Sequence, residues 1–120
     1  MITPTTIRVI ASSDRGIFIG HDSSEDEYCI FELGDTHEIL VGDRLLGDFH
    51  GHSASTFWAR NITRGDSPRI DLRDWELPLI TAVERLVAVQ SATQFVVGHK
   101  IIMAHSHDVV SQLVDEIGRV

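Results

Sequence analysis

Two histidine pairs are the residues of this sequence best suited to chemistry. His50 and His52 flank a glycine in "DFHGHSAS", and His105 and His107 flank a serine in "AHSHD". Residues two apart on a strand project from the same face, so either pair could direct two imidazoles at one metal ion. All four together would suit a divalent metal such as zinc, as in a small metal-binding protein or metal-dependent enzyme. The alternative, which the sequence favours, is two unrelated loops, because a closed site also needs ligands fixed by neighbouring side chains.

The sequence shows little sign of any other catalytic site. The chain contains no GxGxxG, GxxxxGK[ST], GxSxG or HExxH motif, which are the common signatures of phosphate binding and hydrolysis. Cys29 is the single cysteine, so an intrachain disulfide and a CxxC motif are both excluded. It alternates with Phe31 and Leu33 and is therefore expected to be a small buried hydrophobe. We expect a protein without catalytic residues and without a cofactor.

Charge is unevenly distributed along the chain. The formal net charge is -8, a sign that disfavours nucleic acid and anionic membranes as partners. Residues 22–48 hold nine acidic residues against Arg44 alone, whereas residues 60–73 hold four arginines against two aspartates. The sequence thus predicts a dipolar molecule, in which four acidic residues steer association with a partner protein. They are Asp22, Glu25, Asp26 and Glu27. The alternative is that this acidic run is simply a solvated face.

Aromatic and arginine residues near the middle of the chain complete the predicted binding surface. Phe49, Trp58, Arg60 and Arg64 are expected at its rim, because aromatic and arginine side chains dominate protein interfaces. Trp58 and Arg60 would also share one strand face with Ile62, as in surfaces that stack the bases of single-stranded nucleic acid.

A third explanation of the aromatic residues needs no ligand. Trp58, Tyr28 and Ile30 would all point away from the core of the expected barrel, and helices at the end of the chain need an apolar surface to cover. Packing of those helices on the outside of the sheet would account for all three side chains.

The first two thirds of the chain must position most of these residues. From residue 6 to about 75, apolar residues alternate in six short segments separated by Gly, Asp and Ser, which is typical of strands and turns. Ile7, Val9 and Ala11, for example, are expected to share one face. Many short strands favour a small closed barrel, because closure removes exposed edges.

Composition changes after Pro78. A helix is predicted over residues 78–91, with Leu79, Val83 and Leu86 on one face. Residues 94–106 are rich in β-branched side chains and predict a bent strand or a hairpin around Gly98. A last helix follows, capped by Ser106 or Asp108 and ending at Gly118. The elements together predict an α+β fold, a barrel followed by a helix-strand-helix unit packed on it.

Two stretches carry a resemblance to known proteins. "YCIFELGDTHEILVGDRLLGDF" (28–49) and "STFWARNITRGDSPRIDLRDWEL" (55–77) resemble a group of small uncharacterised bacterial proteins that look like OB-type or cold-shock-like barrels. The resemblance implies an OB-like antiparallel barrel over about residues 5–77. It implies no substrate, and fold does not determine function.

Length and hydropathy set the remaining expectations. A chain of 120 residues is long enough to fold as one domain, 1–120, without disulfides or a structural metal. No apolar run approaches the roughly 20 residues needed to cross a bilayer, and the N-terminal sequence does not resemble a signal peptide, so a cytoplasmic location is expected. The function expected is that of a non-catalytic acidic binding protein, in an adaptor, inhibitor or immunity-like role. Its partner would be another protein, and a homodimer is compatible with the sequence. The alternatives are single-stranded nucleic-acid binding and a histidine-dependent metal site.

Overall fold

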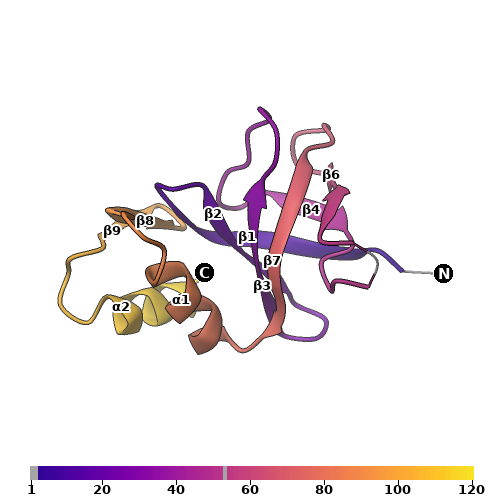
Figure 1. Ribbon diagram of the computed structural model, residues 1–120. Coiled ribbons are helices and arrows are strands. Elements are labelled where there is room, and N and C mark those ends of the chain that lie inside the picture. The colour runs from indigo at the N-terminus through magenta and orange to yellow at the C-terminus, as the bar shows by residue number, and fades with distance from the viewer. Residues whose placement is uncertain (1–2, 53) are drawn as a thin grey trace.

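The structure is a computed structural model that describes residues 3–52 and 54–120. It consists mainly of antiparallel strands, with two helices gathered at one end (Figure 1). The elements are β1 (Thr5–Ser13), β2 (Ile17–Asp22), β3 (Glu27–Leu33), β4 (Arg44–Gly47), β5 (Thr56–Trp58), β6 (Arg60–Asn61), β7 (Arg69–Leu77), α1 (Leu79–Val87), β8 (Gln94–Val97), β9 (Lys100–Met103) and α2 (Val109–Ile117). The predicted α+β class is confirmed.

The strands form one curled sheet. Its order is β5-β7-β3-β2-β1-β4-β6, and β8 pairs with the end of β1 and carries β9 on its far side. All of these pairs are antiparallel. Within the described residues no pairing joins β5 to β6, so the ladder of hydrogen bonds is open between them. The closed barrel expected from the sequence is therefore not formed by strand pairing.

The central strands are buried on both faces because two hydrophobic cores share them. The helix-side core lies between the sheet and the two helices. The sheet-side core lies inside the curl of the sheet. On β2, Ile17 and Ile19 enter the helix-side core while Phe18 enters the sheet-side core. On β3, Ile30 and Phe31 divide in the same way.

A β-bulge in β1 contradicts one expectation from the sequence. The register with β2 shifts between Val9 and Ala11, and an extra residue in one strand reverses the faces that follow it. Ile7 and Val9 therefore face the sheet-side core, whereas Ala11 faces the helix-side core with Ile10. Period-two alternation placed all three of Ile7, Val9 and Ala11 on one face, which is wrong.

The two predicted helices are confirmed with different ends. α1 buries Ala82, Val83 and Leu86 against the sheet and begins directly after Pro78. It ends at Val87, before the predicted residue 91, and Ser91 has a φ of 65°, which a helix cannot accommodate. α2 begins after Asp108, as expected, but the side chain of that residue makes no capping hydrogen bond and its φ is 54°.

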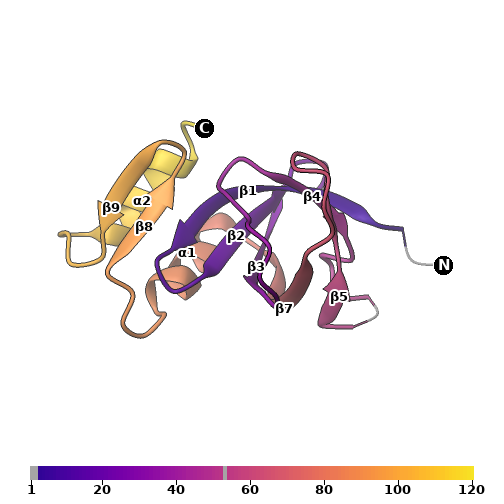
Figure 2. The ribbon, with the colours of Figure 1, turned by 90° about the horizontal axis from the view of Figure 1, so that it is seen from above.

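The segment between the helices is the predicted hairpin. β8 and β9 pair from Gln94↔Met103 to Val97↔Lys100, and the turn uses Gly98 at a φ of +58°. Seen from above, this hairpin and α2 lie side by side at one end of the molecule, away from β4 and β5 (Figure 2). No helix in the described chain is long and apolar enough to cross a membrane.

Candidate functional site

His50 is held in place by the residue that precedes it. Phe49 is 1% exposed and lies in the sheet-side core, with ring centroids 5.5 Å from Phe31 and 5.1 Å from Phe57. Phe49 thus anchors the segment after β4 and brings His50 to the end of β2. The expectation that Phe49 forms part of a binding rim is wrong, because its ring has no surface to offer a partner.

A buried carboxylate orients the His50 ring. Asp22 Oδ2 lies 2.9 Å from His50 Nε2, and Asp22 Oδ1 accepts hydrogen bonds from the backbone N–H and hydroxyl of Ser24. Desolvation by burial opposes ionisation of Asp22, but the hydrogen bonds from Ser24 and His50 outweigh it and lower the pKa of its carboxyl. An ionised Asp22 can only accept, so Nε2 donates the hydrogen bond to it, and in the neutral ring the lone pair is then on Nδ1.

The structure also corrects the role expected of Asp22. This residue is 5% exposed, so it does not present a charge to an approaching partner. Its carboxylate is committed to Ser24 and His50 inside the protein.

Two further carboxylates lie close to His50. Glu27 Oε2 lies 3.6 Å from His50 Nδ1. One ligand atom from each of Glu27, His50 and Glu76 lies within 4.8 Å of the others. Glu27 begins β3, His50 follows β4 and Glu76 lies near the end of β7. Three segments distant in sequence therefore bring one imidazole and two carboxylates together, a set we call the Glu27–His50–Glu76 cluster.

A bulge in β7 accounts for the position of Glu76. Tyr28 pairs with Leu77 and Ile30 pairs with Asp74, so β7 has one residue more than β3 over this stretch. Glu76 has a φ of 54°, in the left-handed region that non-glycine residues rarely adopt. Bulges redirect side chains and occur often beside functional sites. Here the bulge accompanies the approach of Glu76 to His50.

Gly51 fixes the loop on the other side of His50. Its φ is +70°, and a Cβ at this position would lie 2.5 Å from Cε2 of Trp75. The backbone of Gly51 therefore rests directly on the indole of Trp75, the residue before Glu76. This contact joins the His50 loop to the bulge that carries Glu76.

The cluster has the chemistry of a metal centre. Imidazole nitrogen and carboxylate oxygen are ligands of divalent transition metals, and three protein ligands leave coordination positions for water. The Asp22–His50 hydrogen bond is the supporting contact that metal-binding histidines usually make through their second nitrogen. The described residues hold no second group of this kind.

The other three histidines named from the sequence do not join this cluster. His52 is exposed, and its ring centroid lies 5.9 Å from that of His50. His105 and His107 are exposed in the connection between β9 and α2. Figures 1 and 2 both show that connection at the opposite end of the molecule from β4 and β5. The single site built from all four histidines is therefore not formed.

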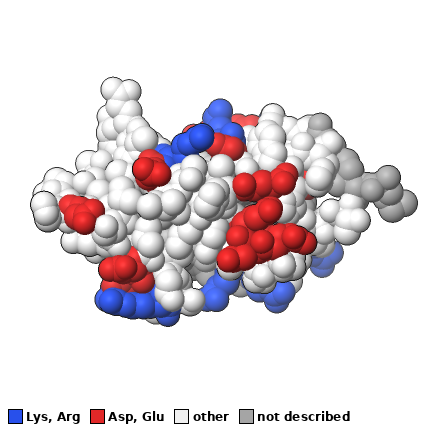
Figure 3. Space-filling model, turned by 90° about the horizontal axis from the view of Figure 1, so that it is seen from below, with Lys and Arg blue, Asp and Glu red and all other residues white. Residues whose placement is uncertain are grey.

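The remaining acidic residues lie at the surface. Glu25 and Asp26 are exposed in the β2–β3 connection, and Asp26 Oδ1 lies 2.9 Å from His21 Nε2. Figure 3 shows acidic side chains gathered in a patch on the side of the molecule where this connection projects.

The acidic and arginine segments partly neutralise each other, which reduces the dipole expected from the sequence. Arg64 Nε lies 2.7 Å from Asp43 Oδ2, and Arg64 also pairs with Glu38. Arg73 pairs with Glu32. Arg64 is therefore engaged within the protein and is not a free anchor for a partner.

Trp58 is the exception among the aromatic residues. Ile30 is 5% exposed in the helix-side core and Tyr28 packs against that core, as the packing explanation requires. Trp58, in contrast, is 69% exposed, so the helices do not cover it. Arg60 and Ile62 are exposed as well, whereas Ala59 lies on the buried side of the same segment.

Two members of the cluster had no clear signal in the sequence. Glu76 lies in a stretch with a strand pattern, and the residue types in "DWELP" do not predict a left-handed backbone conformation at this position. Glu27 belongs to the acidic run, which predicts a surface charge. No family model matches the chain, and no curated protein or solved structure matches it either.

Proposed function

We propose that this protein binds one divalent transition-metal ion, with zinc the first candidate. Its protein ligands are His50 Nδ1 and one carboxylate oxygen each from Glu27 and Glu76. One observation carries the proposal: the buried Asp22 occupies Nε2 of His50, Nδ1 lies 3.6 Å from Glu27, and a carboxylate oxygen of Glu76 completes a group whose ligand atoms lie within 4.8 Å of one another. An imidazole lone pair close to two negative groups is unfavourable unless a cation lies between them.

A protonated His50 is the main competing explanation. An imidazolium would donate to Asp22 through Nε2 and attract Glu27 through Nδ1, without any metal. That explanation gives no reason for Glu76 to hold a left-handed backbone conformation beside a second carboxylate. A bound cation accounts for all three side chains and for the bulge.

Metal titration of matched variants tests the proposal. The protein is purified without a histidine tag, treated with chelator and titrated with Zn²⁺ and Mn²⁺ by isothermal calorimetry. We expect one site per chain, lost in Glu27→Gln and His50→Gln. Asp22→Asn should weaken binding by about 10- to 100-fold, because it removes the group that orients the ligand.

His52→Gln and His107→Gln are the matched controls. Each removes an exposed imidazole that lies outside the cluster, so each should bind metal as the wild type does. Equal loss of binding in a control and in His50→Gln would show adventitious surface binding, and a wild type that takes up no metal would end the proposal.

A second function, binding of a partner protein, is supported by the exposure of Trp58. This side chain, with Arg60 and Ile62, forms an exposed strip beside the sheet-side core, and such residues are enriched in the energetic centres of interfaces. Glu25 and Asp26 would steer the association. Analytical ultracentrifugation of the wild type and of Trp58→Ser tests whether the partner is a second copy. Quenching of tryptophan fluorescence by a single-stranded oligonucleotide in the wild type, and not in Trp58→Ser, would instead favour nucleic acid.

A further inference from the structure

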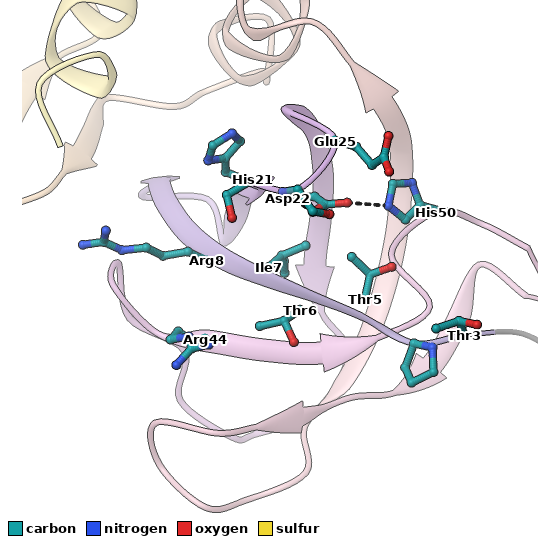
Figure 4. Close-up of a pocket in the computed structure, with 13 residues that line it drawn as sticks. Thr3, Thr5, Thr6, Ile7, Arg8, His21, Asp22, Glu25, Arg44 and His50 are labelled. Atoms are coloured by element: carbon teal, nitrogen blue, oxygen red, sulfur yellow. Dashed lines mark hydrogen bonds and ion pairs between the residues drawn. The ribbon is translucent and has the colours of Figure 1, made fainter.

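A cavity of about 610 Å³ opens on the side of His50 and Asp22 where the start of β1 passes. Its floor is β1, and its walls are the end of β2, the β2–β3 connection and the start of β4 (Figure 4). Figure 4 shows Arg8 and Arg44 toward one end, and His50 and Glu25 toward the other. Glu27 and Glu76 do not line it, whereas His50 and Asp22 do, so the cavity adjoins the metal cluster without containing its two glutamates.

Two arginines are direct neighbours at the first end. Arg8 on β1 pairs in register with Arg44 on β4, and both are exposed. Like charges placed opposite each other on antiparallel strands destabilise the pair. A protein with a net charge of -8 has ample acidic residues to relieve this repulsion.

The repulsion between the two arginines is not relieved by an ion pair within the part of the chain that the structure describes. Among the described residues, no carboxylate pairs with Arg8 or Arg44. Five other basic residues do have carboxylate partners: Arg64, Arg73, Arg85, Lys100 and Arg119. Arg15, Arg60 and Arg69 also have no carboxylate partner among the described residues, but only Arg8 and Arg44 both lack one and line this cavity. They supply it with unmatched positive charge, and a guanidinium recognises phosphate well because it donates in a planar fork.

Hydroxyl and carboxylate groups continue the cavity away from the arginines. Thr5 and Thr6 line the cavity along β1, and Glu25 lies at the end near His50 (Figure 4). This end suits hydroxyl groups of a ligand, which donate to carboxylates. It does not suit a second phosphate, because negative charges would then meet.

We propose that this cavity binds a small phosphorylated molecule rich in hydroxyl groups, of the sugar phosphate class. Arg8 and Arg44 hold the phosphate, and the threonines and Glu25 hold the hydroxyl groups. The alternation of charge from one end to the other favours a compact ligand over a nucleic-acid strand, whose successive phosphates would have to pass Glu25.

Calorimetry in the presence of EDTA tests the proposal independently of any metal. The probes are inorganic phosphate, glucose 6-phosphate and glucose. We expect glucose 6-phosphate to bind more tightly than phosphate, and glucose to give no detectable binding. Arg8→Gln and Arg44→Gln should each weaken glucose 6-phosphate binding by about 10- to 100-fold, the effect of losing a charged hydrogen bond.

Arg69→Gln is the matched control, since Arg69 is also an exposed strand arginine but does not line the cavity. It should bind as the wild type does, and thermal melting of every variant should confirm folding. Absence of glucose 6-phosphate binding, or equal binding by Arg8→Gln, Arg44→Gln and the wild type, would overturn the proposal.

Two further experiments distinguish this proposal from nucleic-acid binding and from binding at the metal cluster. A thymidine oligonucleotide that binds more tightly than glucose 6-phosphate, through the same two arginines, would assign the phosphate to nucleic acid and overturn the small ligand. Glu76→Gln, which disrupts the metal cluster, should leave glucose 6-phosphate binding in EDTA unchanged. Loss of binding in that variant would show that the two sites are one.

Discussion

Replacing Glu76 should make the protein more stable and unable to hold its metal. The residue has a φ of 54°, and a left-handed conformation costs a non-glycine residue roughly 1–2 kcal/mol. Glycine adopts it freely but loses about 0.5–1 kcal/mol through the greater entropy of the unfolded chain. The Glu27 and Glu76 ligand atoms lie within 4.8 Å of each other, and at the dielectric of water such repulsion is about 1 kcal/mol, less after screening.

These terms predict that Glu76→Gly raises the free energy of unfolding by roughly 1 kcal/mol in EDTA. Glu76→Gln keeps the backbone strain and removes only the charge, so it should gain less. For a chain of this length, 1 kcal/mol corresponds to about 4 °C in Tm. The difference between the two variants isolates the contribution of the backbone.

Bound metal should reverse the order of stability, so that the wild type becomes more stable than both variants. At a free Zn²⁺ concentration 100 times the Kd, the wild type should gain about 2.7 kcal/mol, whereas both variants should gain much less. The assay is urea unfolding of the three proteins with EDTA and with Zn²⁺. Two results would refute the reasoning: a Glu76→Gly protein less stable than the wild type in EDTA, or one stabilised by Zn²⁺ as much as the wild type.

Three other predictions concern residues whose roles the structure changed or fixed. Phe49→Ala should lower the free energy of unfolding by about 3–5 kcal/mol, and Trp58→Ala should change it by less than about 0.5 kcal/mol; urea melts giving equal losses would contradict this. Burial raises the pKa of the Cys29 thiol to about 12, so a disulfide reagent should label it only after unfolding, and fast labelling of the native protein would show otherwise. Desolvation opposes ionisation of Asp43, but hydrogen bonds, among them one from Asn61, outweigh it and lower its pKa below 3.8. The stability that its ionised form contributes is present above that pH and is lost as pH falls through the lower folded-state pKa. Asp43→Asn should therefore be less stable than the wild type at neutral pH and should lose less in acid, which urea midpoints across the range would measure.

Much of the fold could be predicted because its signals are local. The apolar face of α1, the stripe of α2 and the turn glycine at Gly98 each depend on residues a few positions apart. The strand-rich character of the chain before Pro78 is predictable for the same reason, although six segments were expected and the described residues form seven strands there. The closed barrel was not formed, because closure depends on pairing between β5 and β6, which no local pattern reports.

The candidate site was predictable only in part. His50 was named from its type and its spacing, but its partners Asp22, Glu27 and Glu76 come from other strands. Asp22 and Glu27 stood in an acidic run that predicted surface charge, and burial of Asp22 depends on the position of the His50 loop. Glu76 depends on a bulge, which adds one residue to a strand and leaves no mark in the composition.

The sharing of β1, β2 and β3 between two cores constrains how the chain can be divided. A cut at Pro78 would follow the change in composition and would look like a boundary between an independent barrel and an appendage. The fragment 1–77 would instead display Ile10, Ile17, Ile19 and Ile30 to water, since the helices are what cover them. Such a continuous aliphatic surface drives association, so the shortened product should precipitate, and efforts to obtain a smaller working unit should keep the C-terminal third of the chain.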